Sequence, residues 1–251
     1  MIRTAWFALI CAGAVVLCAD RAASAQPDAA TGTSKNIVLF GGTRGTGLEI
    51  AKRLRADGHR VTVAVRASSE TDELEKLGVR TVVADALERR TIDLALSGQH
   101  FDAAISTVGT SRGDKANRPD YLGNRNIIDA VAAAGIKRMV LITVIGAGDS
   151  AGSEPTLARY FLKEVIELKT KAEDHLRTTS LDYTIIRPGG LGNGPAGRSA
   201  VLIEDPQAFS YITRADLARL TVAALFDPAT YRKTLTAYDA ERQHIWSIWT
   251  D

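Results

Sequence analysis

The chain has 251 residues, of which 45% are hydrophobic and 24% charged, and its formal net charge is +2. This composition is typical of one globular α/β domain with enough apolar material for a large core. The near-neutral charge provides no bulk attraction to nucleic acid or to an anionic membrane surface, so neither kind of partner is expected.

Residues 1–25 have the features of a cleavable signal peptide. A basic residue precedes an apolar run over residues 5–19, and residues 23–25 (ASA) fit the small-x-small pattern of a cleavage site. Cleavage predicts a mature chain that starts at Gln26 and an exported, periplasmic protein. The alternative is an uncleaved membrane anchor formed by residues 5–19, although this run is short for a membrane span. Residues 26–34 are small and polar and predict a linker.

Cysteine and histidine usage excludes several kinds of chemistry. Cys11 and Cys18 both lie in the predicted signal peptide, so the mature chain has no disulfide, no thiolate nucleophile and no cysteine metal site. The histidines are dispersed and show no metal-ligand spacing, and a G-x-S-x-G motif is absent. We therefore expect no metal and find no support for a hydrolase.

After the linker, strand-like and helix-like patterns alternate along the chain. Strands are predicted over residues 35–40, 59–66, 79–86, 101–110, 136–146 and 181–189. Helices are predicted over residues 45–58, 69–78, 87–98, 124–135 and 156–179. The last part is less regular, with a glycine-rich loop at 189–198, a strand near 200–204, a helix at about 213–226 and a strand near 233–238.

The alternation predicts the fold class. Six apolar strands separated by helices indicate a parallel sheet that is covered on both faces. Right-handed crossovers then give an α/β fold with a doubly wound, mostly parallel Rossmann-like sheet and helices on both faces. We expect one such domain over residues 35–251, with a small substrate-side portion at about 189–251.

The stretch GGTRGTG, residues 41–47, joins the first predicted strand to the first predicted helix. A short glycine turn at this place aims backbone N–H groups and the positive end of the helix at one point, which suits a pyrophosphate. Because the run follows a strand and opens a helix, it predicts a dinucleotide site. The predicted cofactor contacts in this turn are Gly41, Thr43, Arg44, Gly45, Thr46 and Gly47.

The residue after the second predicted strand bears on which nucleotide binds. NAD-binding Rossmann domains usually place Asp or Glu there, about 20 residues after the turn, to hold the ribose 2′-OH. This chain has Arg66, whose fork of donors suits a 2′-phosphate. Arg44 and Ser68 can add contacts, so we favour NADP over NAD. The alternative is that Arg66 is a solvated loop arginine.

Two further strand ends are expected at the same crevice, because ligands bind outside the carboxyl ends of the strands in such sheets. Asp85 and Ala86 end the third predicted strand, where a polar side chain can meet the adenine amino group. Thr107, Val108 and Gly109 end the fourth, where the backbone can pass close to the cofactor ribose. Asp85 would serve equally well as a helix cap, and both roles stay open.

The chain shares a series of segments, in order, with a known family. These are GGTRGTG, VAVR, VVADAL, STVGT, NIIDAVAAAGIKRMVLIT, KTKAEDHLRTTSLDYTIIRPGGL and ITRADLA. Together, over roughly residues 35–240, they resemble the NAD(P)H-binding branch of the atypical short-chain dehydrogenase/reductases. That branch includes NmrA-like proteins and the flavin and biliverdin-IXβ reductases. The resemblance implies a Rossmann fold, NADP binding and, in many members, reductase activity.

The resemblance also implies catalytic positions, with one departure from the usual pattern. Many short-chain dehydrogenases use Tyr-x-x-x-Lys, whereas Tyr160 and Lys163 are one residue too close. Residues three apart still share a helix face, so Tyr160 stays a catalytic candidate. Lys169 matches the family's helix lysine better and is expected near the nicotinamide ribose. Thr143 is expected beside the nicotinamide, where relatives have Ser or Thr, and the alternative is an ordinary β-branched strand residue. Pro188 is expected to close over the nicotinamide face.

Two functional hypotheses follow. The first is an NADP-dependent oxidoreductase that transfers hydride from NADPH to a small carbonyl, quinone or flavin-like acceptor, with the proton taken from solvent as in flavin-reductase-like members. The second is a non-catalytic NADP-binding redox sensor or scaffold, as NmrA-like proteins suggest and the shortened Tyr–Lys spacing supports. An exported location is in tension with both, because free NADPH is a cytoplasmic cofactor.

Overall fold

The computed structural model describes residues 33–110, 118–197 and 199–244. The chain divides into two units, Met1–Gly32 and Thr33–Asp251, and all described residues belong to the second. The predicted signal peptide lies outside the described residues, so export and membrane anchoring stay predictions. Within the described ranges, no helix is both long and apolar enough to cross a membrane.

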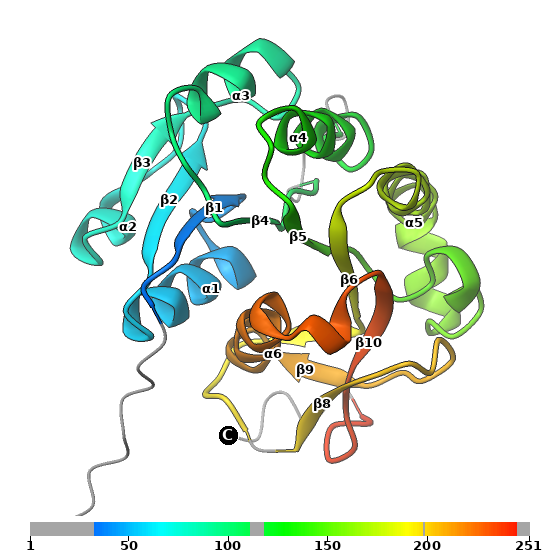
Figure 1. The fold of residues 1–251 in the computed structure, drawn as a ribbon. Helices are drawn as coiled ribbons and strands as arrows, with labels where there is room; N and C mark the ends of the chain where they lie inside the picture. Colours follow the sequence, from blue (N-terminus) through cyan, green and yellow to red (C-terminus); the bar gives the residue numbers. More distant parts are fainter. Residues whose placement is uncertain (1–32, 111–117, 198, 245–251) are drawn as a thin grey trace, which may run out of the picture. The chain divides into compact units, whose positions relative to one another are not determined.

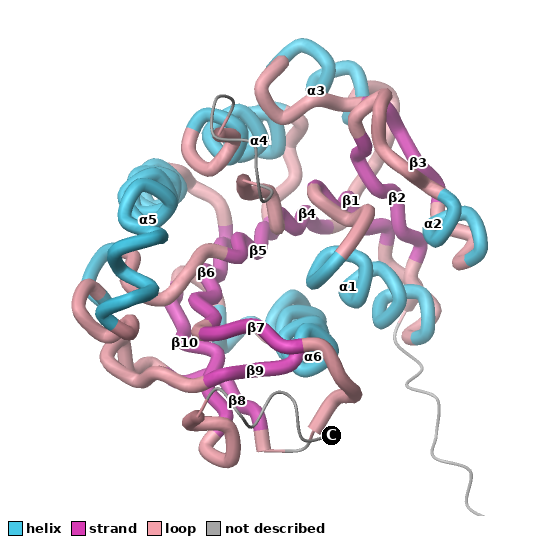
Figure 2. The backbone as a smooth tube through the Cα atoms, turned by 180° about the vertical axis from the view of Figure 1, so that it is seen from behind, coloured by secondary structure: helices cyan, strands magenta, loops and turns pink. Residues whose placement is uncertain are grey.

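An eight-stranded sheet forms the centre of the described unit, in the order β3-β2-β1-β4-β5-β6-β10-β8 (Figures 1 and 2). Its strands are β1 (Asn36–Phe40), β2 (Arg60–Val65), β3 (Arg80–Val83), β4 (Ala103–Ser106), β5 (Arg138–Ile142), β6 (Asp182–Pro188), β8 (Ala200–Ile203) and β10 (Lys233–Asp239). Neighbouring strands pair in parallel, except that β8 pairs with β10 in the antiparallel direction.

Helices cover both faces of this sheet (Figure 1). The described α-helices are α1 (Gly45–Ala56), α2 (Asp72–Lys76), α3 (Arg89–Leu96), α4 (Leu122–Ala133), α5 (Thr156–Arg177) and α6 (Arg214–Phe226). Two 3₁₀ turns, η1 (Gly148–Ser150) and η2 (Pro228–Thr230), precede α5 and β10. Buried side chains of α1, α2 and α6 belong to one apolar cluster, and those of α3, α4 and α5 belong to a second.

The strand β1 shows why both faces are covered. Successive side chains of a strand point to opposite faces, so Ile37 and Leu39 pack with α1 and α6, whereas Val38 and Phe40 pack with α3 and α4. All four side chains are at most 2% exposed. A strand that is buried on both sides needs a continuous apolar run rather than alternation. The predicted doubly wound, mostly parallel fold is therefore confirmed.

The structure departs from the predicted elements mainly at the ends of strands. The third and fourth strands end at Val83 and Ser106, so the residues that follow each of them form loops. In the stretch predicted as a glycine-rich loop, Gly190–Gly192 forms β7, which pairs in parallel with β9 (Tyr211–Thr213) in a small second sheet. A Cβ added at Gly190 would lie 2.1 Å from the Tyr211 ring. The pairing thus requires glycine, which hides the strand from any apolar pattern.

Candidate functional site

The topological switch point of the sheet lies between β1 and β4. These strands are neighbours, but the helices that follow them, α1 and α4, cover opposite faces. The loops after the two strands therefore diverge at the carboxyl edge of the sheet, where open α/β sheets bind their ligands. We call this edge, formed by the ends of β1, β4, β5 and β6, the carboxyl edge.

The glycine turn is packed tightly against the loop after β4. The backbone of Gly41 has a φ of +87°, which favours glycine. A Cβ at Gly41 would lie 2.7 Å from Oγ1 of Thr107, and one at Gly47 would lie 2.1 Å from the carbonyl oxygen of Gly41. The Thr107 hydroxyl donates a hydrogen bond to this same carbonyl at 3.0 Å. Strand, turn and helix are thus packed so closely that only glycine fits at Gly41 and Gly47.

Replacing Gly47 by alanine should destabilise the protein by roughly 1–3 kcal/mol, because the new Cβ overpacks the start of α1. Helix propensity alone predicts the opposite sign, a gain of about 1 kcal/mol. Urea unfolding measures the difference. Gly197→Ala is the control, since a Cβ there would make only ordinary contacts, the nearest at 3.4 Å from Oδ2 of Asp216. Unchanged stability in Gly47→Ala would contradict the close packing.

The arginines of this region, Arg44 in the turn and Arg66 after β2, are accessible to solvent. Arg44 occupies the N-cap position of α1 without a capping hydrogen bond from its side chain, and it is exposed, as is Gly45, while Thr43 and Thr46 are half-buried. Arg66 directly follows β2 and is exposed. Neither arginine makes a side-chain hydrogen bond or an ion pair with another described residue. Both guanidinium groups are therefore available to an anion.

The loop after β3 is largely satisfied by its own contacts. The Asp85 carboxylate accepts a hydrogen bond from the Leu87 backbone N–H at 2.9 Å. The Ala86 carbonyl accepts one from Nδ2 of Asn126 at 2.9 Å. Of the two roles left open for Asp85, the helix cap is not formed, because the N-cap position of α3 is Glu88. The Asp85 carboxylate closes the turn before α3 instead, and its contact with the adenine stays a prediction.

A buried lysine joins the ends of β4 and β5. Nζ of Lys169 donates to the carbonyl oxygens of Val108 at 2.5 Å and Ile142 at 3.4 Å. Its other neighbour is Oδ1 of Asp120, at 3.9 Å, which is buried and accepts no hydrogen bond from a described residue. A Cβ at Gly109 would lie 3.0 Å from this oxygen and 3.4 Å from Nζ. Gly109 therefore packs directly against the Lys169–Asp120 pair, and a side chain there would crowd both groups.

The protonation of Lys169 is perturbed by its surroundings. Burial lowers the pKa of the Lys169 ammonium, and the carboxylates of Asp120 and Glu173 offset part of this effect. An ammonium has three protons to donate, and Val108 and Ile142 accept two of them. One N–H of Lys169 is thus left for Asp120 or for a ligand.

Thr143 lies directly after β5, but its hydroxyl is already engaged. It donates to Oε1 of Glu173 at 2.7 Å, and Arg187 holds the same carboxylate in a bidentate pair at 3.0 and 2.6 Å. Arg177 adds a contact of 3.0 Å to Oε2 of Glu173. Nη1 of Arg187 also pairs with Asp149. The structure shows a role for Thr143 that neither interpretation included, because its hydroxyl anchors the end of β5 to the buried Glu173–Arg187 ion pair.

Tyr160 is not brought together with Lys169 and Thr143. Its side chain is 80% exposed and its ring packs edge-on against Phe161. Lys169 follows Tyr160 by nine positions on α5, which corresponds to a rise of about 13 Å along the helix. Pro188, in contrast, is buried at the end of β6, and its carbonyl accepts a hydrogen bond from Ile145 at 2.9 Å. It thus ties β6 to the loop after β5, at the carboxyl edge.

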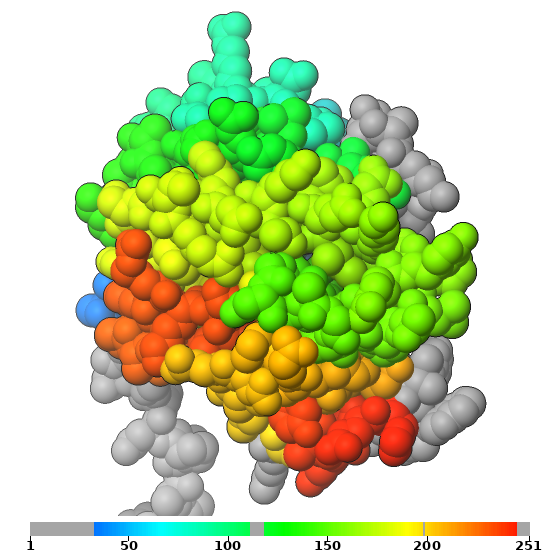
Figure 3. Space-filling model, turned by 90° about the vertical axis from the view of Figure 1, so that its right-hand side faces the viewer, coloured from blue at the N-terminus to red at the C-terminus, as the bar shows by residue number. Residues whose placement is uncertain are grey.

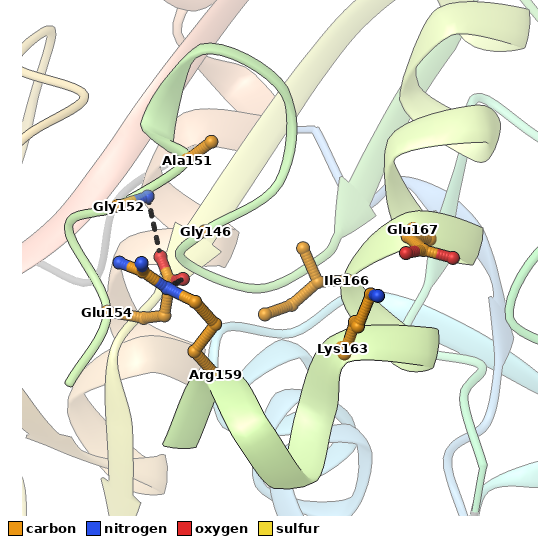
Figure 4. Close-up of a pocket in the computed structure, with 8 residues that line it drawn as sticks. All are labelled: Gly146, Ala151, Gly152, Glu154, Arg159, Lys163, Ile166 and Glu167. Atoms are coloured by element: carbon orange, nitrogen blue, oxygen red, sulfur yellow. Dashed lines mark hydrogen bonds and ion pairs between the residues drawn. The ribbon is translucent and has the colours of Figure 1, made fainter. Parts of the chain in front are cut away.

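A pocket of about 380 Å³ lies between the loop after β5 and α5 (Figures 3 and 4). In the close-up, Glu154 on the loop accepts from the Gly152 backbone at 3.0 Å, and it pairs with Arg159 at 2.5 Å. Arg159, Lys163 and Glu167 line the pocket at four-residue steps and so form one stripe of the helix. Neither Lys169 nor Asp120 lines this pocket, so the pocket is separate from the Lys169–Asp120 pair.

Three buried charged residues of this edge were given no role in the sequence interpretation. Asp120 lies beside Lys169, Glu173 accepts from Thr143, and Arg187 pairs with Glu173. Glu173 and Arg187 belong to the shared segment KTKAEDHLRTTSLDYTIIRPGGL, and Glu173 also follows Lys169 by four residues on a predicted helix, which places both on one face. Asp120 and Arg187 meet this helix only through the tertiary structure.

Comparisons with known proteins agree with this geometry. A family model described as NAD(P)H-binding matches residues 41–228. ChuY, an anaerobilin reductase from Escherichia coli O157:H7, is similar in structure, with a TM-score of 0.75 and 30% identity over 83% of this chain and 99% of that chain. YhfK of Bacillus subtilis (strain 168), named as an uncharacterized sugar epimerase, is 32% identical over 175 residues, 68% of this chain and 78% of that protein.

A third relative is of a different kind. Ycf39 of Synechocystis, a photosystem II assembly factor, is 28% identical over 209 residues, which are 79% of this chain. The match covers 60% of that protein, so the chain spans less than two thirds of its length. The family match starts at the glycine turn and ends just after α6. It confirms the resemblance to NAD(P)H-binding, atypical short-chain dehydrogenase/reductases, and the chain belongs to this oxidoreductase-like NAD(P)H-binding family.

Proposed function

We propose that the protein is an NADP-dependent oxidoreductase that transfers hydride from NADPH to a small carbonyl, quinone or flavin-like acceptor. The observation that carries the choice of NADP is Arg66, an exposed cation without an ion-pair partner among the described residues, directly after β2. An acidic residue at this position would favour the ribose 2′-OH, whereas a guanidinium favours a 2′-phosphate.

The residues at the carboxyl edge fit a dinucleotide. Gly41 and Gly47 let strand β1, the turn and the start of α1 pack closely together, and Arg44 stands at the positive end of α1, where a diphosphate would lie. Thr107, Val108 and Gly109 would border the ribose on the nicotinamide side. When bound, NADPH supplies the hydride, so the protein mainly has to hold and orient the two reactants.

The chain's own groups have distinct tasks in this proposal. Lys169 offers its remaining N–H to a ribose hydroxyl or to the acceptor oxygen. The Thr143 hydroxyl donates its hydrogen bond to Glu173, so Thr143 helps to hold the carboxyl edge in place rather than acting as an acid. The proton that accompanies the hydride would come from solvent. The similarity to ChuY, which is an anaerobilin reductase, supports reduction as the type of reaction.

Calorimetric titration with NADPH and NADH tests the proposal. The protein should bind NADPH more tightly than NADH, and Arg66→Ala should weaken NADPH binding by about ten- to a hundredfold, because a hydrogen bond to a charged group contributes about 1.5–3 kcal/mol. The affinity for NADH should not change. Arg60→Ala is the matched control, since Arg60 is also exposed but lies at the opposite end of β2. Failure of the unmodified protein to bind either nucleotide would refute the proposal.

The second candidate is a non-catalytic NADP-binding sensor or scaffold. It is favoured by the position of Tyr160, which is exposed and removed from Lys169, and by the engaged hydroxyl of Thr143. The similarity to Ycf39, an assembly factor, supports it as well. Oxidation of NADPH in the presence of menadione or flavin would favour the reductase. Tight NADPH binding without oxidation of any offered acceptor would favour the sensor.

A further inference from the structure

Arg214, the first residue of α6, lies against the glycine turn although it is distant in sequence. A Cβ built on Gly45 would lie 3.5 Å from Nε of Arg214 and 3.8 Å from its Cδ. Gly45 itself is exposed and opens α1. The guanidinium therefore packs beside the place where the turn presents its backbone to a ligand.

The side chain of Arg214 is held in this position. Its Nη1 donates to Oδ1 of Asn193 at 2.8 Å. Asn193 directly follows β7, and Thr213, the last residue of β9, caps α6 by accepting a hydrogen bond from Asp216. Gly192 and Thr213 are paired in the small sheet. The pairing of β7 with β9 thus fixes both Asn193, which accepts the hydrogen bond from Arg214, and Thr213, which precedes Arg214 in the chain.

The charge of Arg214 is not neutralised within the described part of the chain, where it has no ion pair. It lines a pocket of about 280 Å³ together with Gly45, Asn193 and the only acidic lining residue, Glu49. The Glu49 carboxylate already pairs with Lys52 at 2.8 Å. A cation that faces a pocket at a helix N-terminus, without a carboxylate of its own, is suited to an anion from outside.

We propose that Arg214 binds the diphosphate of the dinucleotide, so that the C-terminal portion of the chain forms a second wall of the cofactor site. This inference rests on the nucleotide binding proposed above. Arg66 and Arg214 then have different tasks, because Arg66 recognises the 2′-phosphate and Arg214 holds the diphosphate that NADP and NAD share. Loss of Arg214 should leave the preference between the two cofactors intact.

The test is calorimetric titration of Arg214→Met, which removes the charge but keeps much of the apolar stem. NADPH and NADH should both bind about tenfold more weakly, as expected for one charged hydrogen-bonding group. Adenosine 2′-phosphate, which lacks the diphosphate, should bind with unchanged affinity. Arg53→Met is the matched control, because it removes one positive charge from α1 near its far end. It should bind all three ligands as the unmodified protein does.

Each result decides a separate question. If the unmodified protein binds no nucleotide, the proposed function fails. If it binds and Arg214→Met binds NADPH and NADH equally well, the inference about Arg214 is overturned while the function stands. Equal weakening of adenosine 2′-phosphate would also overturn it, since the effect would then be structural or would concern the 2′-phosphate. Arg214→Lys, which keeps the charge, should recover most of the affinity for both dinucleotides.

Discussion

Replacement of Arg187 by methionine should lower the free energy of unfolding by about 3–5 kcal/mol, because it leaves the Glu173 carboxylate buried without its main partner. Arg187 is 1% exposed and Glu173 is fully buried. Thr143 and Arg177 would remain as donors, but the bidentate pair with Arg187 would be lost. Urea unfolding near neutral pH measures the effect.

Two further variants separate the buried charge from simple loss of packing. Arg177→Met removes another donor to Glu173, but the Arg177 side chain is 33% exposed, so its loss should matter much less. The double variant Arg187→Met/Glu173→Gln should be more stable than Arg187→Met alone, since the uncompensated charge is then removed. Similar losses in Arg177→Met and Arg187→Met would contradict this account.

Replacement of Lys169 by methionine should reduce the NADPH-dependent turnover about a hundredfold or more, as is typical when one positioned donor is removed from an active site. It removes the only described side chain that bridges the carbonyls of Val108 and Ile142. Steady-state NADPH oxidation with menadione or flavin measures the change. Lys171→Met is the matched control, because Lys171 is exposed on the same helix. Equal activity of the two variants would remove Lys169 from the site.

The burial of Lys169 also predicts a pH dependence of stability. Burial lowers the pKa of Lys169 below its ordinary value of 10.5, so the folded state releases this proton at a lower pH than the unfolded state does. Between the two pKa values the unfolded state binds more protons, and the free energy of unfolding therefore rises with pH. Stability measured towards pH 10 should rise more in the unmodified protein than in Lys169→Met. Parallel curves would mean that Lys169 has an ordinary pKa.

Local patterns predicted the long elements well. The helix expected over residues 156–179 spans Thr156–Arg177, and the helix expected at about 213–226 spans Arg214–Phe226. Periodicity and capping residues are properties of neighbouring positions, so they are visible without the fold. The small sheet of β7 and β9 was missed because its pairing depends on glycine and on a partner about 20 residues away.

The glycine turn and Arg66 were predicted from the sequence because the βαβ unit is local. Its order along the chain places the turn at the helix start and Arg66 at the end of the next strand. Tyr160 was named as a catalytic candidate on spacing alone, and spacing does not tell which end of a helix reaches the site. The structure leaves Tyr160 at the solvent-exposed start of α5.

The sequence by itself determined the doubly wound fold, because strand and helix periodicity are local properties. It also predicted the glycine turn between the first strand and the first helix from a short motif, and the resemblance to a known family singled out Lys169 on α5. Only the tertiary structure decided which charges meet. Asp120 beside Lys169, Arg187 on Glu173 and Arg214 beside Gly45 each join segments that are far apart in the chain. Such contacts depend on strand order and on the packing of helices against the sheet, and no local pattern in the residues encodes them.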